Sequence, residues 1–78
     1  MPNPQIVYLG WVCDEDGAPL FHSIHTTNAG AENAVVAFLE EHHGARLANY
    51  DAWADFYAEQ FPLDARSFGV ERFEVKHA

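Results

Sequence analysis

The stretch NYDAWADFYAEQF, residues 49–61, has two chemically different faces when it is wound as an α-helix. At 3.6 residues per turn, its large aromatic side chains fall on one side and three carboxylates, each four residues from the next, fall on another. A rise of about 1.5 Å per residue puts successive carboxylates about 6 Å apart along the axis. The aromatic side comprises Tyr50, Trp53, Tyr57 and Phe61, and the acidic stripe comprises Asp51, Asp55 and Glu59. We therefore expect a helix that is anchored by its aromatics and shows its acids to solvent.

The residues at the N-terminal end of the chain predict a β-hairpin. QIVYLGWVC, residues 5–13, is almost continuously apolar and rich in β-branched and aromatic residues, which favours a strand. The following Asp16-Gly17 pair is typical of a tight turn, and LFHSIHTT, residues 20–27, is the predicted return strand. Because the first strand is apolar on both sides, we expect it at the centre of a sheet. Helices should cover one side, and the other side should be an interface or be shielded by long side chains.

Two helices and a third strand are expected to follow. Asn28 is the predicted N-cap of a helix over residues 29–43 that ends at Gly44. The aromatic helix then spans about residues 51–61, capped by Asn49 or Asp51, and FGVERFEVK, residues 68–76, predicts the last strand. The order β-β-α-α-β predicts an α+β fold, in which two helices pack on one face of a three-stranded sheet. A chain of 78 residues with no linker is expected to form a single domain, residues 1–78.

The apolar pattern of these elements also predicts a core. On the first strand we expect Val7 and Leu9 to face inward, whereas Trp11 is a candidate for exposure. The side chains predicted to be mostly buried are Val7, Leu9, Ile24, Val35, Phe38, Leu39, Trp53, Tyr57, Phe61 and Phe73.

The chain is acidic, with twelve Asp and Glu against four Lys and Arg and a formal net charge of −8. Residues 1–45 hold six of the acids and none of the bases, so −6 of the −8 lies in that part of the chain. Such a surface repels nucleic acid and anionic membranes and attracts basic proteins. We therefore expect no direct binding to nucleic acid or to a membrane.

Cysteine usage and hydropathy indicate the compartment. The chain has one cysteine, Cys13, so an internal disulfide is excluded and a reducing environment is favoured. No apolar run approaches the roughly 18 residues that are needed to span a bilayer, and residues 1–5 lack the basic start of a signal peptide. A cytoplasmic protein is the expectation.

The predicted topology gathers most of the acids at one end of the domain. If the two helices pack antiparallel, the hairpin turn, the end of the first helix and the start of the second lie together. From there the acidic stripe runs down the second helix. The predicted partner-binding residues are Asp14, Glu15, Asp16, Glu40, Glu41, Asp51, Asp55 and Glu59.

Enzyme and metal chemistry have weaker support in the sequence. Cys13 with His25 as a base would form a nucleophile across the hairpin, but the flanking acids oppose a thiolate and no catalytic motif is present. Cys13 with His22 and Asp14 would supply at most three metal ligands. We therefore expect a protein that is not an enzyme and holds no cofactor or metal. The alternatives are an antitoxin or another small interaction or dimerisation module and, with less support, a small metal-binding protein.

In size, acidity and layout the whole chain resembles the small phage-encoded anti-CRISPR proteins. The resemblance is carried by the acids of residues 14–16, by Glu40 and Glu41, and by the acidic stripe, because that group shares no motif. It implies a non-enzymatic inhibitor, acting in the cytoplasm of a host cell, that mimics or displaces DNA. The implied partner is a basic nucleic-acid-binding protein, such as a CRISPR effector complex, and the inhibitor itself would be a monomer or a homodimer.

Overall fold

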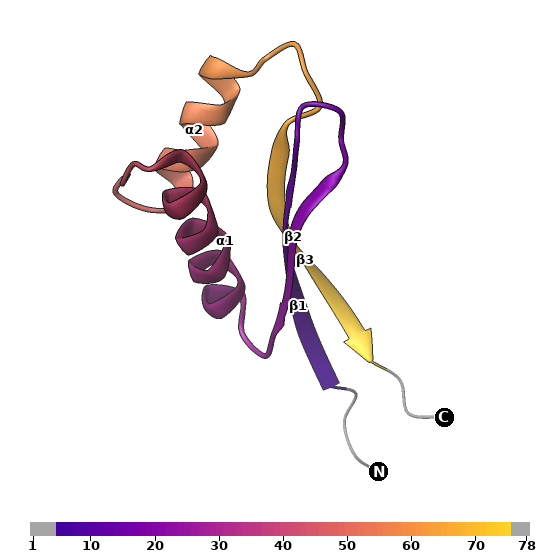
Figure 1. Ribbon diagram of the computed structural model, residues 1–78. Coiled ribbons are helices and arrows are strands. Elements are labelled where there is room, and N and C mark those ends of the chain that lie inside the picture. The colour runs from indigo at the N-terminus through magenta and orange to yellow at the C-terminus, as the bar shows by residue number, and fades with distance from the viewer. Residues whose placement is uncertain (1–4, 76–78) are drawn as a thin grey trace.

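The computed structural model describes residues 5–75, which form a sheet layer and a helix layer (Figure 1). The antiparallel sheet has the strand order β2-β1-β3, and both helices lie on one of its faces. The predicted α+β fold with ββααβ order is therefore confirmed. The elements are β1 (Gln5–Cys13), β2 (Pro19–His25), α1 (Asn28–His43), α2 (Tyr50–Gln60) and β3 (Ser67–Val75).

Local hydrogen bonds explain where the helices begin and end. The Thr27 hydroxyl accepts the N–H of Gly30 at 3.0 Å, so Thr27 is the N-cap of α1 and the prediction of Asn28 is wrong by one residue. Gly44 ends α1 in the left-handed conformation with φ of 66°, as expected. The Asn49 side chain accepts the N–H of Ala52 at 2.9 Å and caps α2. These caps are local signals, which is why the sequence showed most of them.

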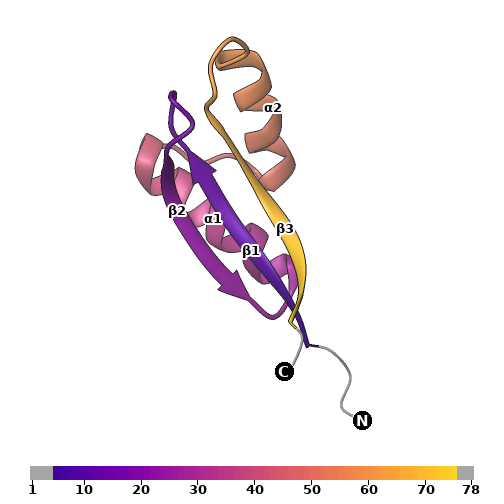
Figure 2. The same cartoon turned by 90° about the vertical axis from the view of Figure 1, so that its right-hand side faces the viewer.

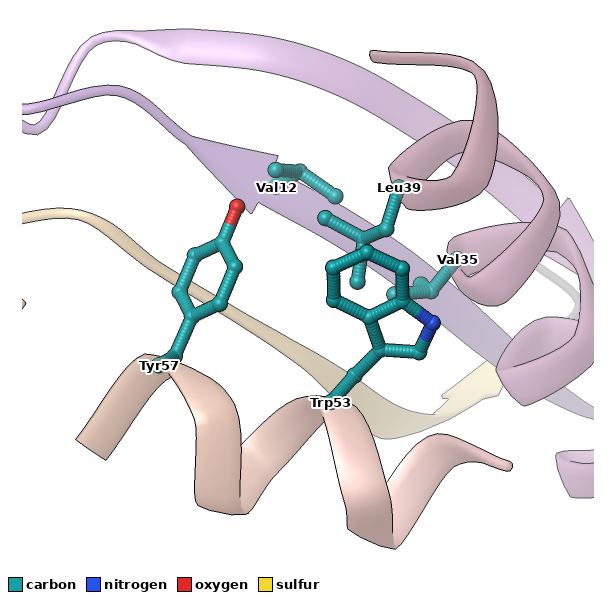
Figure 3. Packing of buried hydrophobic residues seen from close by; sticks show 5 residues of the cluster. All are labelled: Val12, Val35, Leu39, Trp53 and Tyr57. Carbon is teal, nitrogen blue, oxygen red and sulfur yellow. The ribbon is translucent and has the colours of Figure 1, made fainter. Parts of the chain in front are cut away.

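The core lies between β1 and the two helices (Figure 3). Trp53 and Tyr57 point from α2 toward β1, and Val35 and Leu39 point from α1 into the same space beside Val12. The burial of these four helical side chains confirms the predicted inward faces of both helices. Trp53 is 1% exposed and is the largest of the fully buried side chains, so it makes the largest single contribution to the core.

The prediction of which side of β1 faces the core is wrong. The side that α1 covers carries Gly10 and Val12, whereas Val7 and Leu9 lie on the side without helices. Their neighbours follow the same alternation, so Ile24 is 70% exposed rather than buried. Phe73, paired with Val7, is 45% exposed for the same reason.

Gly10 explains this choice of face. A Cβ atom at Gly10 would lie 2.9 Å from Val35 Cγ2 and 3.0 Å from the Ala31 carbonyl oxygen. The missing side chain thus lets α1 approach the centre of β1 directly, and α1 cannot make this approach on the side where Trp11 projects. Phe38 and Phe61, also predicted as core, are half-buried at the margin.

The second helix runs in the opposite direction to the one predicted. Figures 1 and 2 show that α1 and α2 both advance toward the end of the sheet that carries the β1–β2 turn. β3 is antiparallel to β1 and therefore begins at that end. A descending α2 would leave residues 61–66 to cover a nine-residue strand of about 30 Å, but six residues reach only about 20 Å. The short connection to β3 therefore requires α2 to run toward the end of the sheet that carries the β1–β2 turn.

Candidate functional site

The acids of the β1–β2 turn serve the turn itself. Asp14 Oδ1 accepts the backbone N–H groups of Asp16 and Ala18, both at 2.9 Å, so this carboxylate holds the turn closed. Gly17 supplies the positive φ of 83° that the turn requires. Asp16 is exposed and its side chain accepts none of these bonds. Of the three predicted turn acids, Asp16 is therefore the one most available to a partner.

Glu15 is paired within the chain. Its carboxylate lies 3.0 Å from the guanidinium of Arg66, and its carbonyl accepts the N–H of Ala65 at 3.3 Å. Arg66 also lies 3.6 Å from the carboxylate of Asp64 and stacks 3.8 Å above the ring centre of Phe61. The loop between α2 and β3 is thereby fastened over the β1–β2 turn, and part of the turn's negative charge is neutralised.

The other predicted acids do not join the turn. Glu40 and Glu41 lie at the end of α1, where they line a hollow of about 410 Å³ with Ala45 and Arg46. Asp51 lies at the start of α2, at the end of that helix that is remote from the turn, and lines a hollow with Glu32. The prediction that most of the acids gather at one end of the domain is therefore wrong, because α2 ends near the β1–β2 turn instead of starting beside it.

The three carboxylates of the acidic stripe are exposed to solvent, as predicted. Asp51, Asp55 and Glu59 are all exposed along α2, while Trp53 and Tyr57 on the same helix are buried. Within residues 5–75 the only ion pairs are those of Arg66 with Glu15 and Asp64, so the three stripe carboxylates are unpaired there. Their negative charge is left uncompensated along about 12 Å of helix, the rise over eight residues.

A histidine that the sequence did not single out lies at the edge of the core. His43 Nε2 is 2.7 Å from the hydroxyl of Tyr57, and the His43 ring also contacts those of Trp53, Phe56 and Phe61. Burial, followed by the nearby charges of His42 and Arg66, lowers the pKa of His43 below its ordinary value of 6.5. The sequence signal was slight, because a helix-end histidine beside a glycine cap is usually solvated.

The hydroxyl partner of His43 is also shifted. Burial raises the pKa of Tyr57, and the opposing effect of Arg66 is smaller. At neutral pH both groups are therefore uncharged, and the Tyr57 hydroxyl can donate to an unprotonated Nε2. This pair holds the end of α1 against α2, and Tyr57 also lines an open hollow of about 490 Å³ together with Tyr50 and Phe68.

The alternatives built on Cys13 find little geometric support. Cys13 and His22 line the same shallow hollow on the helix-free side of the sheet, but Asp14 is occupied in the turn. His25 is bonded to the Ser23 hydroxyl at 2.6 Å and pairs with Tyr8 on the opposite side of the sheet, so it cannot serve Cys13 as a base. Across the described residues no group of three His, Cys, Asp or Glu side chains is arranged to hold a metal ion.

Comparisons with known proteins give no relative to reason from. No protein-family model, curated protein or solved structure matches the chain. Among residues 5–75 there is also no helix with the length and hydropathy that a membrane crossing requires.

Proposed function

We propose that this protein is a non-enzymatic inhibitor that binds a basic nucleic-acid-binding protein in the cytoplasm of its host cell and blocks the access of DNA. The observation that carries the proposal is the acidic stripe of Asp51, Asp55 and Glu59, exposed and unpaired within residues 5–75. Carboxylates about 6 Å apart on a rigid helix present a charge spacing close to that of phosphates along one strand of nucleic acid. Lys and Arg side chains that hold DNA can therefore pair with the stripe instead.

The rigidity of α2 strengthens this proposal. Trp53 and Tyr57 fix the helix to the core, and Asn49 caps its start, so the carboxylates are held in place before binding. Binding then costs less conformational entropy than it would for acids on a mobile loop. Asp16 and Glu41 are also exposed and extend the negative field beyond the stripe. A CRISPR effector complex is the partner class that we favour.

Target-DNA binding by purified CRISPR effector complexes provides the test. The wild-type protein should reduce DNA binding, and the reduction should weaken as salt rises, because charges are screened over about 8–10 Å near physiological ionic strength. Asp51→Lys combined with Asp55→Lys should abolish the inhibition. A matched pair of single variants, Asp55→Lys and Glu74→Lys, changes the charge equally, but Glu74 lies on β3 away from the stripe.

The proposal is wrong if Asp55→Lys and Glu74→Lys inhibit equally well, since net charge rather than the stripe would then act. It is also wrong if no effector complex is inhibited and capture on the immobilised protein yields no nucleic-acid-binding protein. Circular dichroism of each variant verifies the fold, which both substitutions should leave intact because the two positions are exposed.

A further inference from the structure

The side of the sheet that carries no helix is an apolar surface. Figure 2 looks onto this side, with all three strands in front and both helices behind. Ile24, Phe73 and Val75 are among the most exposed large apolar side chains, at 70%, 45% and 39%. The first two flank Leu9 and Val7 of the central strand across the ladder, so the apolar side chains of three strands adjoin one another. We call this surface the open face.

A tryptophan of the central strand lies flat on the open face. A Cβ atom at Gly69 would lie only 2.8 Å from Trp11 Cζ2, so the indole lies across the backbone of β3 where Gly69 leaves room. The ring borders a shallow hollow of about 330 Å³, which Leu9, His22 and Glu71 also line. The indole Nε1 is buried and lacks a hydrogen-bond partner within the described residues. Tryptophans that project from such a surface are enriched among the residues that anchor protein interfaces.

We propose that the open face binds the open face of a second copy of this chain, with a twofold axis parallel to β1. The low charge of the open face indicates that its partner is another apolar face. The chain has twelve acids, and within residues 5–75 Glu71 is the one that lies on the open face. A highly charged partner would gain little there, whereas a second apolar sheet removes both surfaces from water. The second copy also has the same twist, which aligned packing of two sheets at about −30° requires.

The size of the open face fits a dimer of modest affinity. Strands of nine residues are about 30 Å long, and three strands about 4.8 Å apart give a flat footprint of roughly 400 Å² on each copy. Protruding side chains raise the buried surface of the pair to on the order of 1,000 Å², the lower end of specific interfaces. We therefore expect a dissociation constant on the order of 1–100 µM.

The single acid selects the direction of the twofold axis. If the axis were perpendicular to β1 and passed near Leu9, each β3 would face the other β3 and the two Glu71 carboxylates would meet. With the axis parallel to β1, β3 of each copy faces β2 of the other, so Glu71 lies opposite Ile24 of the second copy, two residues along β2 from His22. The parallel axis avoids burying two like charges together, which is costly in a low dielectric.

In this dimer both helix layers face outward. The acidic stripes of the two copies lie on opposite outer sides, and both remain accessible. The dimer does not depend on the stripe, because the two surfaces occupy opposite faces of the sheet. Loss of dimerisation and loss of partner binding are therefore separable by the residues changed.

Sedimentation velocity of the full chain from about 1 to 500 µM, a range that brackets the expected affinity, tests the dimer. The mass should rise from 8.8 kDa toward twice that value. Ile24→Lys should raise the dissociation constant at least about 100-fold, because a buried unpaired charge opposes association. Leu63→Lys is the matched control, since Leu63 is 98% exposed in the α2–β3 loop and away from the open face. A monomer at all concentrations, or equal dimerisation by both variants, overturns the proposal.

Crosslinking through Cys13, the one cysteine of the chain, distinguishes the two directions of the twofold axis. With the twofold axis parallel to β1, Cys13 of one copy lies opposite Cys13 of the other across sheets about 10 Å apart. A bismaleimide of that span should link the two thiols in wild type and in Leu63→Lys, and Ile24→Lys should prevent the link. With a perpendicular axis the thiols would be about 26 Å apart, eight residues along the strands. A dimer that the reagent does not link therefore overturns the parallel axis.

Discussion

The guanidinium of Arg66 lies 3.0 Å from the carboxylate of Glu15, which is fifty-one residues earlier in the chain. This pair joins the end of the α2–β3 loop to the β1–β2 turn. The two segments pack closely, because a Cβ atom added at Gly17 would lie 3.5 Å from the Cβ of Ala65. The direction of α2, and with it the position of every acid on that helix, is tied to this closure.

Removing Arg66 should loosen the closure by a modest amount. Arg66→Ala deletes two ion pairs with partly exposed carboxylates and the stacking over Phe61. Exposed pairs contribute about 0–1 kcal/mol and cation–π contacts about 0.5–1 kcal/mol, so we expect a loss of about 1–2 kcal/mol in the free energy of unfolding. Urea denaturation measures it. Arg46→Ala is the control, because Arg46 is exposed and should change stability by less than about 0.5 kcal/mol.

Truncation of Trp53 and of Ile24 should have opposite outcomes. Trp53→Ala removes the largest fully buried side chain and should cost about 3–5 kcal/mol. Ile24→Ala should cost less than about 0.5 kcal/mol when it is measured well below the dissociation constant of the dimer, because this side chain is exposed in the monomer. Similar costs for the two variants would contradict the assignment of the covered face.

Adding a methyl group at Gly10 should disturb the contact between the layers. The new Cβ of Gly10→Ala would meet Val35 Cγ2 at 2.9 Å and backbone of Ala31 at 3.0 Å, and neither can move without shifting α1. We expect a loss of about 1–3 kcal/mol, which is typical of overpacking. Gly69→Ala meets only the Trp11 ring on the open face, so its cost in the monomer should be smaller. Thermal denaturation at low protein concentration compares the two variants.

Stability should fall at mildly acidic pH through His43. The pKa of His43 is lowered in the folded protein, so the unfolded chain takes up a proton first as the pH falls. The stabilisation is fully present above the unfolded value of 6.5 and is lost as the pH falls through 6.5 toward the lower folded value. Unfolding measured at several pH values between about 8 and 5 should show this loss in the wild type, and His43→Gln should reduce it.

A matched histidine controls for general effects of pH. His22→Gln is that control, because it removes an exposed imidazole from β2 and leaves the contact of His43 with Tyr57 in place. Tyr57→Phe should lower the free energy of unfolding at neutral pH by about 0.5–1.5 kcal/mol, because it removes the 2.7 Å hydrogen bond to His43. If His43→Gln and the wild type lose stability in parallel, His43 is not the group that titrates.

The helices and strands could be read from the sequence, because their signals are local. The apolar run of residues 5–13, the left-handed Gly44 and the Asn49 cap act within a few residues of where they stand, and each of these predictions is confirmed. The inward face of α2 was equally readable, since one side of that helix is aromatic and another acidic. The exposure of the acidic stripe follows from the same periodicity.

The face of β1 that the helices cover and the direction of α2 depend instead on contacts between distant parts of the chain. Both faces of β1 are apolar, so alternation could not choose between them; the choice was made by the close approach that Gly10 allows α1. The direction of α2 was decided by the short path to the start of β3, a constraint between segments far apart in the chain. The direction of α2 also determines which residues of the two helices are neighbours. It places Tyr57 beside His43, and it places Asp51 at the end of α2 that is remote from the β1–β2 turn.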